Sequence, residues 1–170
     1  QDLRDQQVGA AAVRHFVFST HYRKQLNLSG VALEASIEAV RRVGGFAERL
    51  ESALGGTAAL GEAARALRAE FDAALFDDLN APRAQAALFV FISQANAEFD
   101  KRGGDEGALE EARAAFARAN GVLDIVPDQQ DVNAALSAWI EAQIAARKAA
   151  RGRRDFAAAD AIRKALEEKG

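Results

Sequence analysis

Apolar side chains recur every three or four residues along most of this chain, which is the spacing of one face of an α-helix. Three segments carry this pattern most clearly. Their apolar positions are Leu33, Ile37, Val40 and Leu50; Leu60, Ala64, Leu67, Phe71 and Leu75; and Ala84, Leu88, Phe91, Ile92, Ala95 and Phe99. Ser29 is expected to cap the first helix and Asn80 the third, where Pro82 fits the first turn. Gly44 and Gly45 are expected to interrupt the first helix near its end.

Shorter periodic segments lie on both sides of these three. An early one holds Val13, Phe16 and Val17; a later one, capped by Asp131, holds Val132, Leu136, Trp139, Ile140 and Ile144; the last holds Phe156, Ala159, Ile162 and Leu166. The glycine pairs Gly55-Gly56 and Gly103-Gly104 mark short loops between helices. Helices joined by short loops favour an all-α fold, an antiparallel helical bundle.

A proline-bearing acidic link, residues 124–128, breaks the helical pattern. We take it as a domain boundary. The prediction is a helical bundle over residues 1–126 and a small, incomplete C-terminal helical subdomain over residues 127–170.

Composition narrows the class of protein. The chain has 170 residues, 49% of them hydrophobic and 28% charged, which suits one domain with a small appendage. No apolar run reaches the roughly 18 residues of a membrane-spanning helix, so no membrane partner is expected. The absence of cysteine excludes disulfides, thiolate ligands and a thiol nucleophile, and we expect a cytoplasmic protein. Because the sequence does not begin with Met, it is expected to be a fragment of a larger protein.

Residues that could carry catalysis are few. His15 and His21 are the only histidines, and their spacing fits no metal-binding motif, so no metal site is expected. No phosphate-cradling glycine motif and no nucleophile elbow occurs, so we expect no catalytic residue and no cofactor in this fragment. Asp77 and Asp78 diverge by about 100° if helical and cannot face one substrate. With Asn80 and Pro82 following, they indicate a helix end and a turn.

A basic run stands out in a chain whose net charge is −3. Five basic residues and no acidic one fall between positions 147 and 154, namely Arg147, Lys148, Arg151, Arg153 and Arg154. Such a cluster can hold a polyanion even on an acidic molecule. It can equally be a solvated helix end that complements the helix dipole. Charge alone leaves both interpretations open.

Three blocks of sequence, residues 13–28, 71–84 and 147–166, resemble segments of bacterial cysteinyl-tRNA synthetases. Residues 13–28 are similar to that family's Ser-x-His-Tyr-Arg-x-x-Leu-Asn-Phe segment. Residues 71–84 are similar to its Asp-Asp-Asp-Phe-Asn-Thr-Pro signature, with Phe76, Leu79 and Ala81 at the three departures from it. Residues 147–166 are similar to its Ala-Arg-x-x-Lys-Asp-Phe-x-x-Ala-Asp-x-Ile-Arg-x-x-Leu block. In order and spacing, these blocks cover nearly the whole chain.

The resemblance implies the anticodon-binding region of a class I synthetase without its Rossmann-type catalytic domain. ATP and zinc would bind in that absent domain. The implied partners are tRNA(Cys) and the protein's own catalytic domain, and DNA is not among them. The chain stops before a short Gly-Ile-x-Leu-Glu-Asp-Thr segment that completes the family's terminal domain, so any anticodon contact from that segment is expected to be absent.

The resemblance also implies that Arg151, Phe156 and Asp160 bind the anticodon. Their chemistry suits that role: a guanidinium fork for a base edge or phosphate, a ring for stacking, and a carboxylate to accept from an exocyclic amine. Phe156 could instead anchor the last helix in a core, and Asp160 could pair with Arg163 or Lys164. The side chains expected on the tRNA backbone are Arg147, Lys148, Arg153, Arg154 and Arg163.

His21, Tyr22 and Arg23 follow the first helix and allow two interpretations. They could contact the tRNA stem or the catalytic domain. Alternatively, Tyr22 fills the bundle while His21 and Arg23 cap helix carbonyls, and we favour this structural role.

Three functions from different classes remain. The chain is the tRNA-binding part of a cysteine–tRNA ligase, part of a mycothiol-pathway cysteine ligase, or a helical protein-interaction module. The mycothiol-pathway enzyme needs no anticodon, so the intact block at residues 151–166 speaks against it.

Overall fold

The computed structural model describes residues 9–101, 103–127 and 143–148. The chain divides into two compact units, Gln1–Pro127 and Asp128–Gly170. In the first unit the elements are α1 (Ala10–Phe18), α2 (Gly30–Ser52), α3 (Ala58–Phe76), α4 (Ala81–Phe99) and α5 (Glu106–Leu123). In the second unit, residues 143–148 are helical. The all-α prediction is confirmed. The functional assignments of 1–126 and 127–170 stay predictions.

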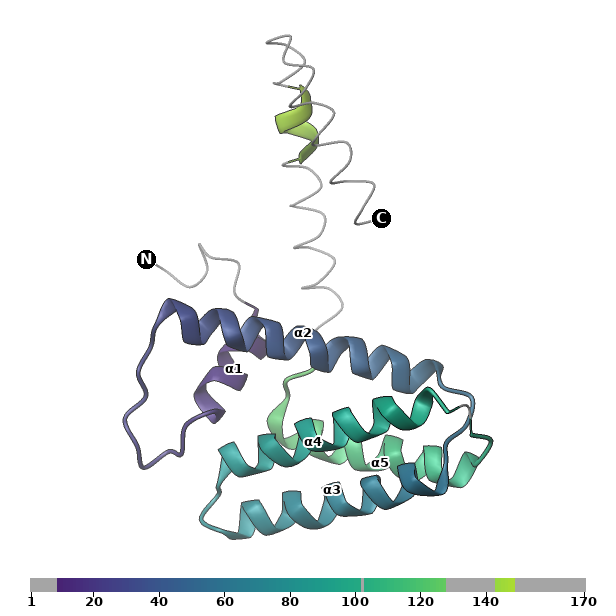
Figure 1. Ribbon diagram of the computed structural model, residues 1–170. Coiled ribbons are helices and arrows are strands. Elements are labelled where there is room, and N and C mark those ends of the chain that lie inside the picture. Colours follow the sequence, from purple (N-terminus) through teal and green to yellow (C-terminus); the bar gives the residue numbers. More distant parts are fainter. Residues whose placement is uncertain (1–8, 102, 128–142, 149–170) are drawn as a thin grey trace. The chain divides into compact units, whose positions relative to one another are not determined.

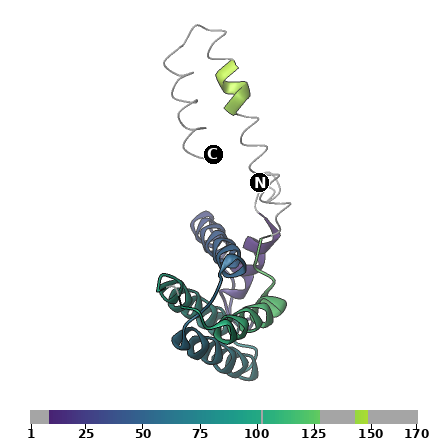
Figure 2. The ribbon, with the colours of Figure 1, turned by 90° about the vertical axis from the view of Figure 1, so that its right-hand side faces the viewer.

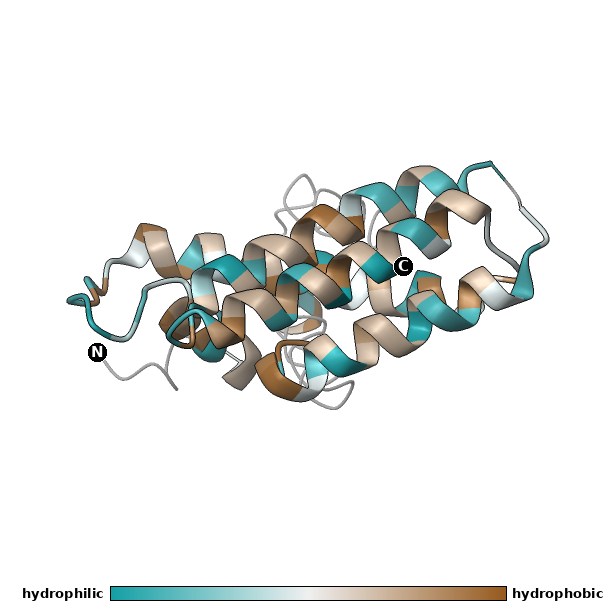
Figure 3. Ribbon diagram, turned by 90° about the horizontal axis from the view of Figure 1, so that it is seen from below, coloured by the Kyte–Doolittle hydropathy of each residue, from teal (hydrophilic) through white to brown (hydrophobic). Residues whose placement is uncertain are grey.

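The helices of the first unit form a layered bundle (Figures 1 and 2). α4 and α5 pack against α3, and α1 packs against α2. α2 lies over α4 and α5, on the side away from α3 (Figure 1). Hydrophobic and hydrophilic residues are interspersed along the helices, as expected of amphipathic sequences (Figure 3).

Phe46 occupies the centre of the core. It is 2% exposed, and its ring lies 5.7 Å from Phe91, 6.1 Å from Phe99 and 5.2 Å from Phe116 between centroids. The rings of Phe91 and Phe116 meet it edge to face, an arrangement that adds to the stabilisation from burial alone. One aromatic side chain therefore joins α2 to α4 and α5.

The predicted interruption at Gly44 and Gly45 is wrong, because α2 continues without a break to Ser52. The buried positions of α2 include Val43 and Phe46, which the predicted apolar face omitted, whereas Ile37 is 37% exposed. Glycine costs a helix about 1 kcal/mol, which the burial of Phe46 and its neighbours outweighs.

Gly44 has a packing role that Gly45 lacks. A Cβ at Gly44 would lie 2.9 Å from Pro127 Cγ, whereas one at Gly45 would meet nothing within 4 Å. We therefore expect Gly45→Ala to raise the free energy of unfolding by about 0.5–1 kcal/mol through helix propensity. Gly44→Ala should fail to give this gain. Chemical denaturation of the two variants measures the difference, and equal stabilisation of both would contradict the contact with Pro127.

α5 was not predicted, because alanine supplies most of its buried face. The buried positions are Ala108, Leu109, Ala112, Ala115, Phe116, Ala119 and Leu123. Small residues let α5 approach α3 closely: a Cβ at Gly61 of α3 would lie 3.4 Å from the Cβ of Ala108. The other helices of the first unit were predicted, although Val17 of α1 is 46% exposed rather than buried.

In four of these helices, a side chain at the N-cap accepts a hydrogen bond from a free backbone N–H of the first turn. Ser29 accepts a hydrogen bond from Ala32 N at 3.2 Å, and Asn80 accepts one from Arg83 N at 3.2 Å, as predicted. Thr57 and Asp105 cap α3 and α5 in the same way. At the end of α2, Arg113 of α5 donates to the carbonyl oxygens of Glu51 at 3.0 Å and Ala53 at 3.1 Å.

The two glycine pairs meet each other at one end of the bundle. Gly56 N donates to Asp105 O at 2.9 Å, and Asp105 N donates to Gly56 O at 2.9 Å. A Cβ at Gly103 would overlap Gly56 O, so the two backbones touch where a side chain would stand. Among the described residues, this bridge is the one β-type pairing. The glycine pairs therefore do more than end helices, because they join the α2–α3 loop to the α4–α5 loop.

Candidate nucleic-acid interface

Most of the predicted RNA-binding residues lie outside the described part of the chain. These are Arg151, Phe156 and Asp160, expected at the anticodon, and Arg153, Arg154 and Arg163, expected on the backbone. Of the remaining two, Arg147 is half-buried and Lys148 exposed within the helical residues 143–148. Ile144, assigned to the apolar face of this helix, is 55% exposed. The RNA contacts of all these side chains stay predictions.

The basic side chains of the bundle are largely engaged with acidic ones. The ion pairs are Arg14–Asp124, Arg23–Asp78, Arg41–Glu38, Arg49–Asp100, Arg65–Glu111, Arg83–Glu70, Lys101–Glu98 and Arg118–Asp72. Within the described range of the bundle, the basic residues with no ion pair are Lys24, Arg42, Arg68 and Arg113. Of these, Arg42 lies over the Phe89 ring at 5.7 Å and Arg113 caps α2. A guanidinium beside a carboxylate attracts phosphate weakly, so this surface is a poor polyanion site.

Charge is distributed unevenly between the two units. Residues 1–127 hold 14 Lys and Arg against 18 Asp and Glu, whereas residues 128–170 hold 8 against 7. The second unit therefore carries a small basic excess, although the whole chain is acidic. Within that unit it is concentrated in the run at residues 147–154.

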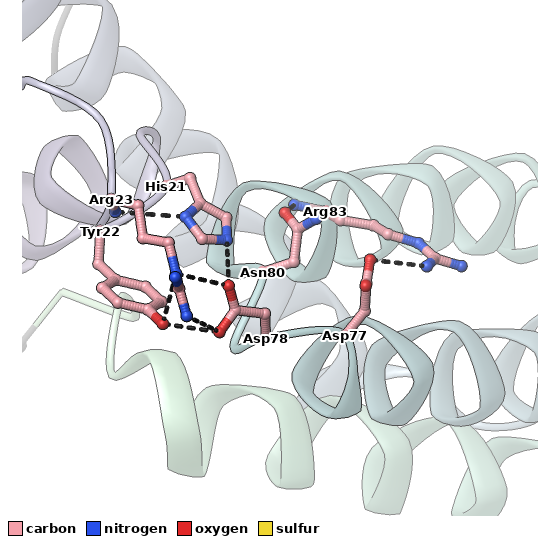
Figure 4. A network of polar contacts seen from close by, with 7 residues as sticks. All are labelled: His21, Tyr22, Arg23, Asp77, Asp78, Asn80 and Arg83. Carbon is pink, nitrogen blue, oxygen red and sulfur yellow. Dashed lines mark hydrogen bonds and ion pairs between the residues drawn. The ribbon is translucent and has the colours of Figure 1, made fainter.

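His21, Tyr22 and Arg23 gather around one carboxylate, that of Asp78 (Figure 4). We call these four residues the Asp78 cluster. Tyr22 Oη donates to Asp78 Oδ1 at 2.6 Å, and Arg23 reaches the same carboxylate with Nη2 at 3.0 Å and Nε at 2.8 Å. His21 Nε2 lies 3.8 Å from Asp78 Oδ2, and its ring stacks on Tyr22 at 4.9 Å. The cluster ties the α1–α2 loop to the α3–α4 turn.

The backbone of the α3–α4 turn presents Asp78 to this loop. α3 ends at Phe76, and Asp78 and Leu79 then adopt φ values of 55° and 51° before Asn80 caps α4. The helix end predicted from Asp77 and Asp78 is thus confirmed. Asp77 pairs with Arg83 at 3.7 Å and Asp78 with the loop, so the two carboxylates serve different partners.

The structural role favoured for His21, Tyr22 and Arg23 takes a different form from the one predicted. Tyr22 does not fill the bundle, because it is 61% exposed. The side chains of His21 and Arg23, expected to cap helix carbonyls, lie against the carboxylate of Asp78 instead. Hydrogen bonds from Tyr22 and Arg23 lower the pKa of Asp78, and the bond to Asp78 raises the pKa of Tyr22. Sequence could not pair these residues, since 55 positions separate Arg23 from Asp78.

His15 fastens α1 to α4 in a setting that disfavours its charged form. Its carbonyl accepts from Gln85 Nε2 at 3.1 Å, its ring meets Phe89 edge to face at 5.7 Å, and its buried Nδ1 has no hydrogen-bond partner. Burial lowers the pKa of His15, and the nearby positive charge of Arg42 lowers it further. The folded state therefore favours the neutral form of His15 over the charged form.

Stability should consequently fall when the pH drops below the ordinary histidine pKa of about 6.5. Below that pH the unfolded chain binds a proton on His15 more readily than the folded chain does. The contribution of neutral His15 to the free energy of unfolding is therefore complete above about pH 6.5, and it is lost as the pH falls through the lower pKa of the folded state. Thermal denaturation at pH 7.5 and 5.5 measures the effect. The loss should be smaller in His15→Gln, and an unchanged pH dependence in that variant would contradict this role.

Within the described residues, no three His, Asp or Glu side chains come together as metal ligands would. The helices found there are all too short or too polar to cross a membrane.

Comparison with known proteins finds similarity to one group of enzymes. Residues 70–126, from the end of α3 through the α3–α4 turn to the end of α5, match the DALR domain. The chain is 39% identical over 172 residues to the cysteine–tRNA ligase of Alkalilimnicola ehrlichii, covering 95% of this chain and 35% of that protein. The cysteine–tRNA ligases of Solibacter usitatus and Micrococcus luteus are 34% and 37% identical, each over 94% of this chain. The chain spans about a third of the length of these relatives. Over almost its whole length the chain is therefore similar to cysteine–tRNA ligases, and its residues 70–126 match the DALR domain.

Proposed function

We propose that this chain is the tRNA-binding C-terminal part of a cysteine–tRNA ligase. It positions tRNA(Cys) and reads its anticodon, while a separate catalytic domain of the same protein, with its ATP and zinc, attaches cysteine. The observation that carries the proposal is the similarity to cysteine–tRNA ligases along 93–95% of the chain, DALR domain included.

The distribution of charge supports different roles for the two units: the first is a structural scaffold, and the second binds the tRNA backbone. Most arginines of the bundle are held by their own carboxylates, so the bundle serves as a scaffold. Electrostatic affinity for the tRNA backbone comes from Arg147, Lys148, Arg153, Arg154 and Arg163, which lie in the unit with the basic excess.

The side chains that recognise the anticodon bases are Arg151, Phe156 and Asp160. Anticodon bases are unstacked in their loop, so an aromatic ring can stack on one of them while polar side chains bind base edges. Phe156 provides the ring, Arg151 paired donors and Asp160 an acceptor. Phe156 and Asp160 are four residues apart, which puts them on one face if the segment is helical.

The test compares binding of tRNA(Cys) with that of an anticodon-altered tRNA(Cys) at two salt concentrations. The unaltered tRNA should bind more tightly. Arg151→Ala and Asp160→Ala should each reduce that preference by about 5- to 150-fold, since a base-edge contact is worth about 1–3 kcal/mol. Arg153→Ala should weaken binding to both tRNAs alike and reduce the salt slope by about one.

Arg65→Ala is the matched control, because Arg65 lies on the bundle and is paired with Glu111. Its salt slope should equal that of the unchanged chain. Equal affinity for both tRNAs would refute anticodon reading, and preserved discrimination in Asp160→Ala would remove Asp160 from the site. Binding that scarcely responds to salt would favour a protein-interaction module instead.

A further inference from the structure

Three large apolar side chains stand exposed where the α1–α2 loop meets the α3–α4 turn. Phe76 is 90% exposed, Leu79 63% and Tyr22 61%. We call these three residues the turn patch. The loop also exposes Leu26 (42%) and Leu28 (60%). Neighbouring exposed aromatic and aliphatic side chains are typical of a surface that another protein covers.

The turn that carries this patch is held in an uncommon conformation. Leu79 has a φ of 51°, a left-handed value that costs a residue with a branched side chain about 1 kcal/mol or more. Tyr22 and Arg23 fix the adjacent Asp78, and Leu79 N donates to Leu75 O at 3.1 Å. The Asp78 cluster thus fixes the turn in the unbound protein. Little conformational entropy would therefore be lost when a partner binds there.

The charges around the patch argue against RNA as its partner. Arg23 is neutralised by Asp78, and Arg83 lies between Glu70 and Asp77. Lys24 of the loop is exposed and has no ion pair within the described part of the chain, but a single lysine beside an apolar surface offers a polyanion little attraction. The turn patch suits an apolar protein surface, and interfaces between domains of one chain commonly mix such residues with paired charges.

The size of the relatives indicates which protein surface this is. The chain matches only 34–36% of their length, so a ligase of that size has about two thirds of its residues elsewhere. Tyr22 follows α1 closely, and α1 has nine residues, a length of about 13 Å. A domain joined ahead of α1 would lie within a short reach of the patch and at high effective concentration.

We infer that the turn patch is the surface on which the catalytic part of the longer protein docks. Phe76 and Leu79 are its apolar anchors, and the Asp78 cluster is a positioning element that holds the turn in place. This inference rests on the proposed function, because it takes the missing part to be the catalytic domain.

Thiol labelling tests the inference, because this chain has no cysteine of its own. Phe76→Cys places a reporter in the patch. Leu54→Cys is the matched control, since Leu54 is 96% exposed beyond the opposite end of the 19-residue α3. Both variants are made in the 170-residue chain and in the longer protein that carries it. Maleimide labelling of each site is followed by peptide mass spectrometry without tRNA.

In the longer protein, labelling of Phe76→Cys should be at least tenfold slower than in the 170-residue chain, while Leu54→Cys keeps its rate. Equal rates for Phe76→Cys in both proteins, or equal slowing of both variants, would overturn the inference. Two other results would also overturn the inference. If labelling of Phe76→Cys slows as the concentration of the 170-residue chain rises, a second copy of the chain covers the patch; if it slows only when tRNA is added, tRNA covers it. Because no tRNA is present in the main measurement, a failure of anticodon reading leaves this result unchanged.

Discussion

Replacing Phe46 by alanine is expected to lower the free energy of unfolding of the bundle by about 3–5 kcal/mol. Phe46 is 2% exposed and touches rings from both α4 and α5, so its removal leaves a cavity between helices. Those helices cannot close the gap without disturbing their own contacts with α3. Urea denaturation followed by circular dichroism measures the loss.

Phe76→Ala is the control for this experiment. The two substitutions remove the same atoms, but Phe76 is 90% exposed. Its stability change in the 170-residue chain should stay within about 0.5 kcal/mol. A loss below about 1 kcal/mol for Phe46→Ala would mean that the ring is not the centre of the core.

Replacing Gly103 by alanine is expected to cost about 1–3 kcal/mol. The new Cβ would overlap Gly56 O and lie 2.6 Å from Gly56 C. Both are backbone atoms, so no side chain can rotate away to relieve the clash. The loops would have to separate, with loss of the two hydrogen bonds between Gly56 and Asp105, each worth about 0.5–1.5 kcal/mol.

Gly104→Ala is the adjacent control, because a Cβ there would meet nothing within 4 Å. Thermal denaturation should show a lower midpoint for Gly103→Ala and a nearly unchanged one for Gly104→Ala. Similar midpoints would show that the two loops do not depend on their close contact.

Local sequence was sufficient where the signal itself is local. The helices around Leu67 and Leu88 were predicted from their periodicity, and Ser29 and Asn80 from capping chemistry that acts within four residues. It failed for α5, since alanine is read as a helix former but hardly as a core residue. It failed again at Gly44 and Gly45, where helix propensity alone suggests an interruption that the packing around Phe46 prevents.

In the candidate site, too, some features follow from local sequence and others depend on the tertiary fold. The motifs that carry the resemblance are contiguous stretches of sequence, and the comparisons agree with them. The partners of His21, Tyr22 and Arg23 could not be predicted, because Asp78 reaches them only after α2 and α3 have folded. The neutralisation of the bundle's arginines was equally hidden, as pairs such as Arg65–Glu111 and Arg118–Asp72 span 46 positions.

The sequence by itself determined the helical class, several helix starts and ends, and the similarity to cysteine–tRNA ligases, since periodicity, caps and motifs all depend on neighbours along the chain. Only the tertiary structure decided which charges are paired, which glycines touch another backbone and which apolar side chains remain exposed. The physical reason is distance. Ion pairs and close contacts act over a few ångströms in space, and residues far apart in the sequence come that close only once the helices have packed.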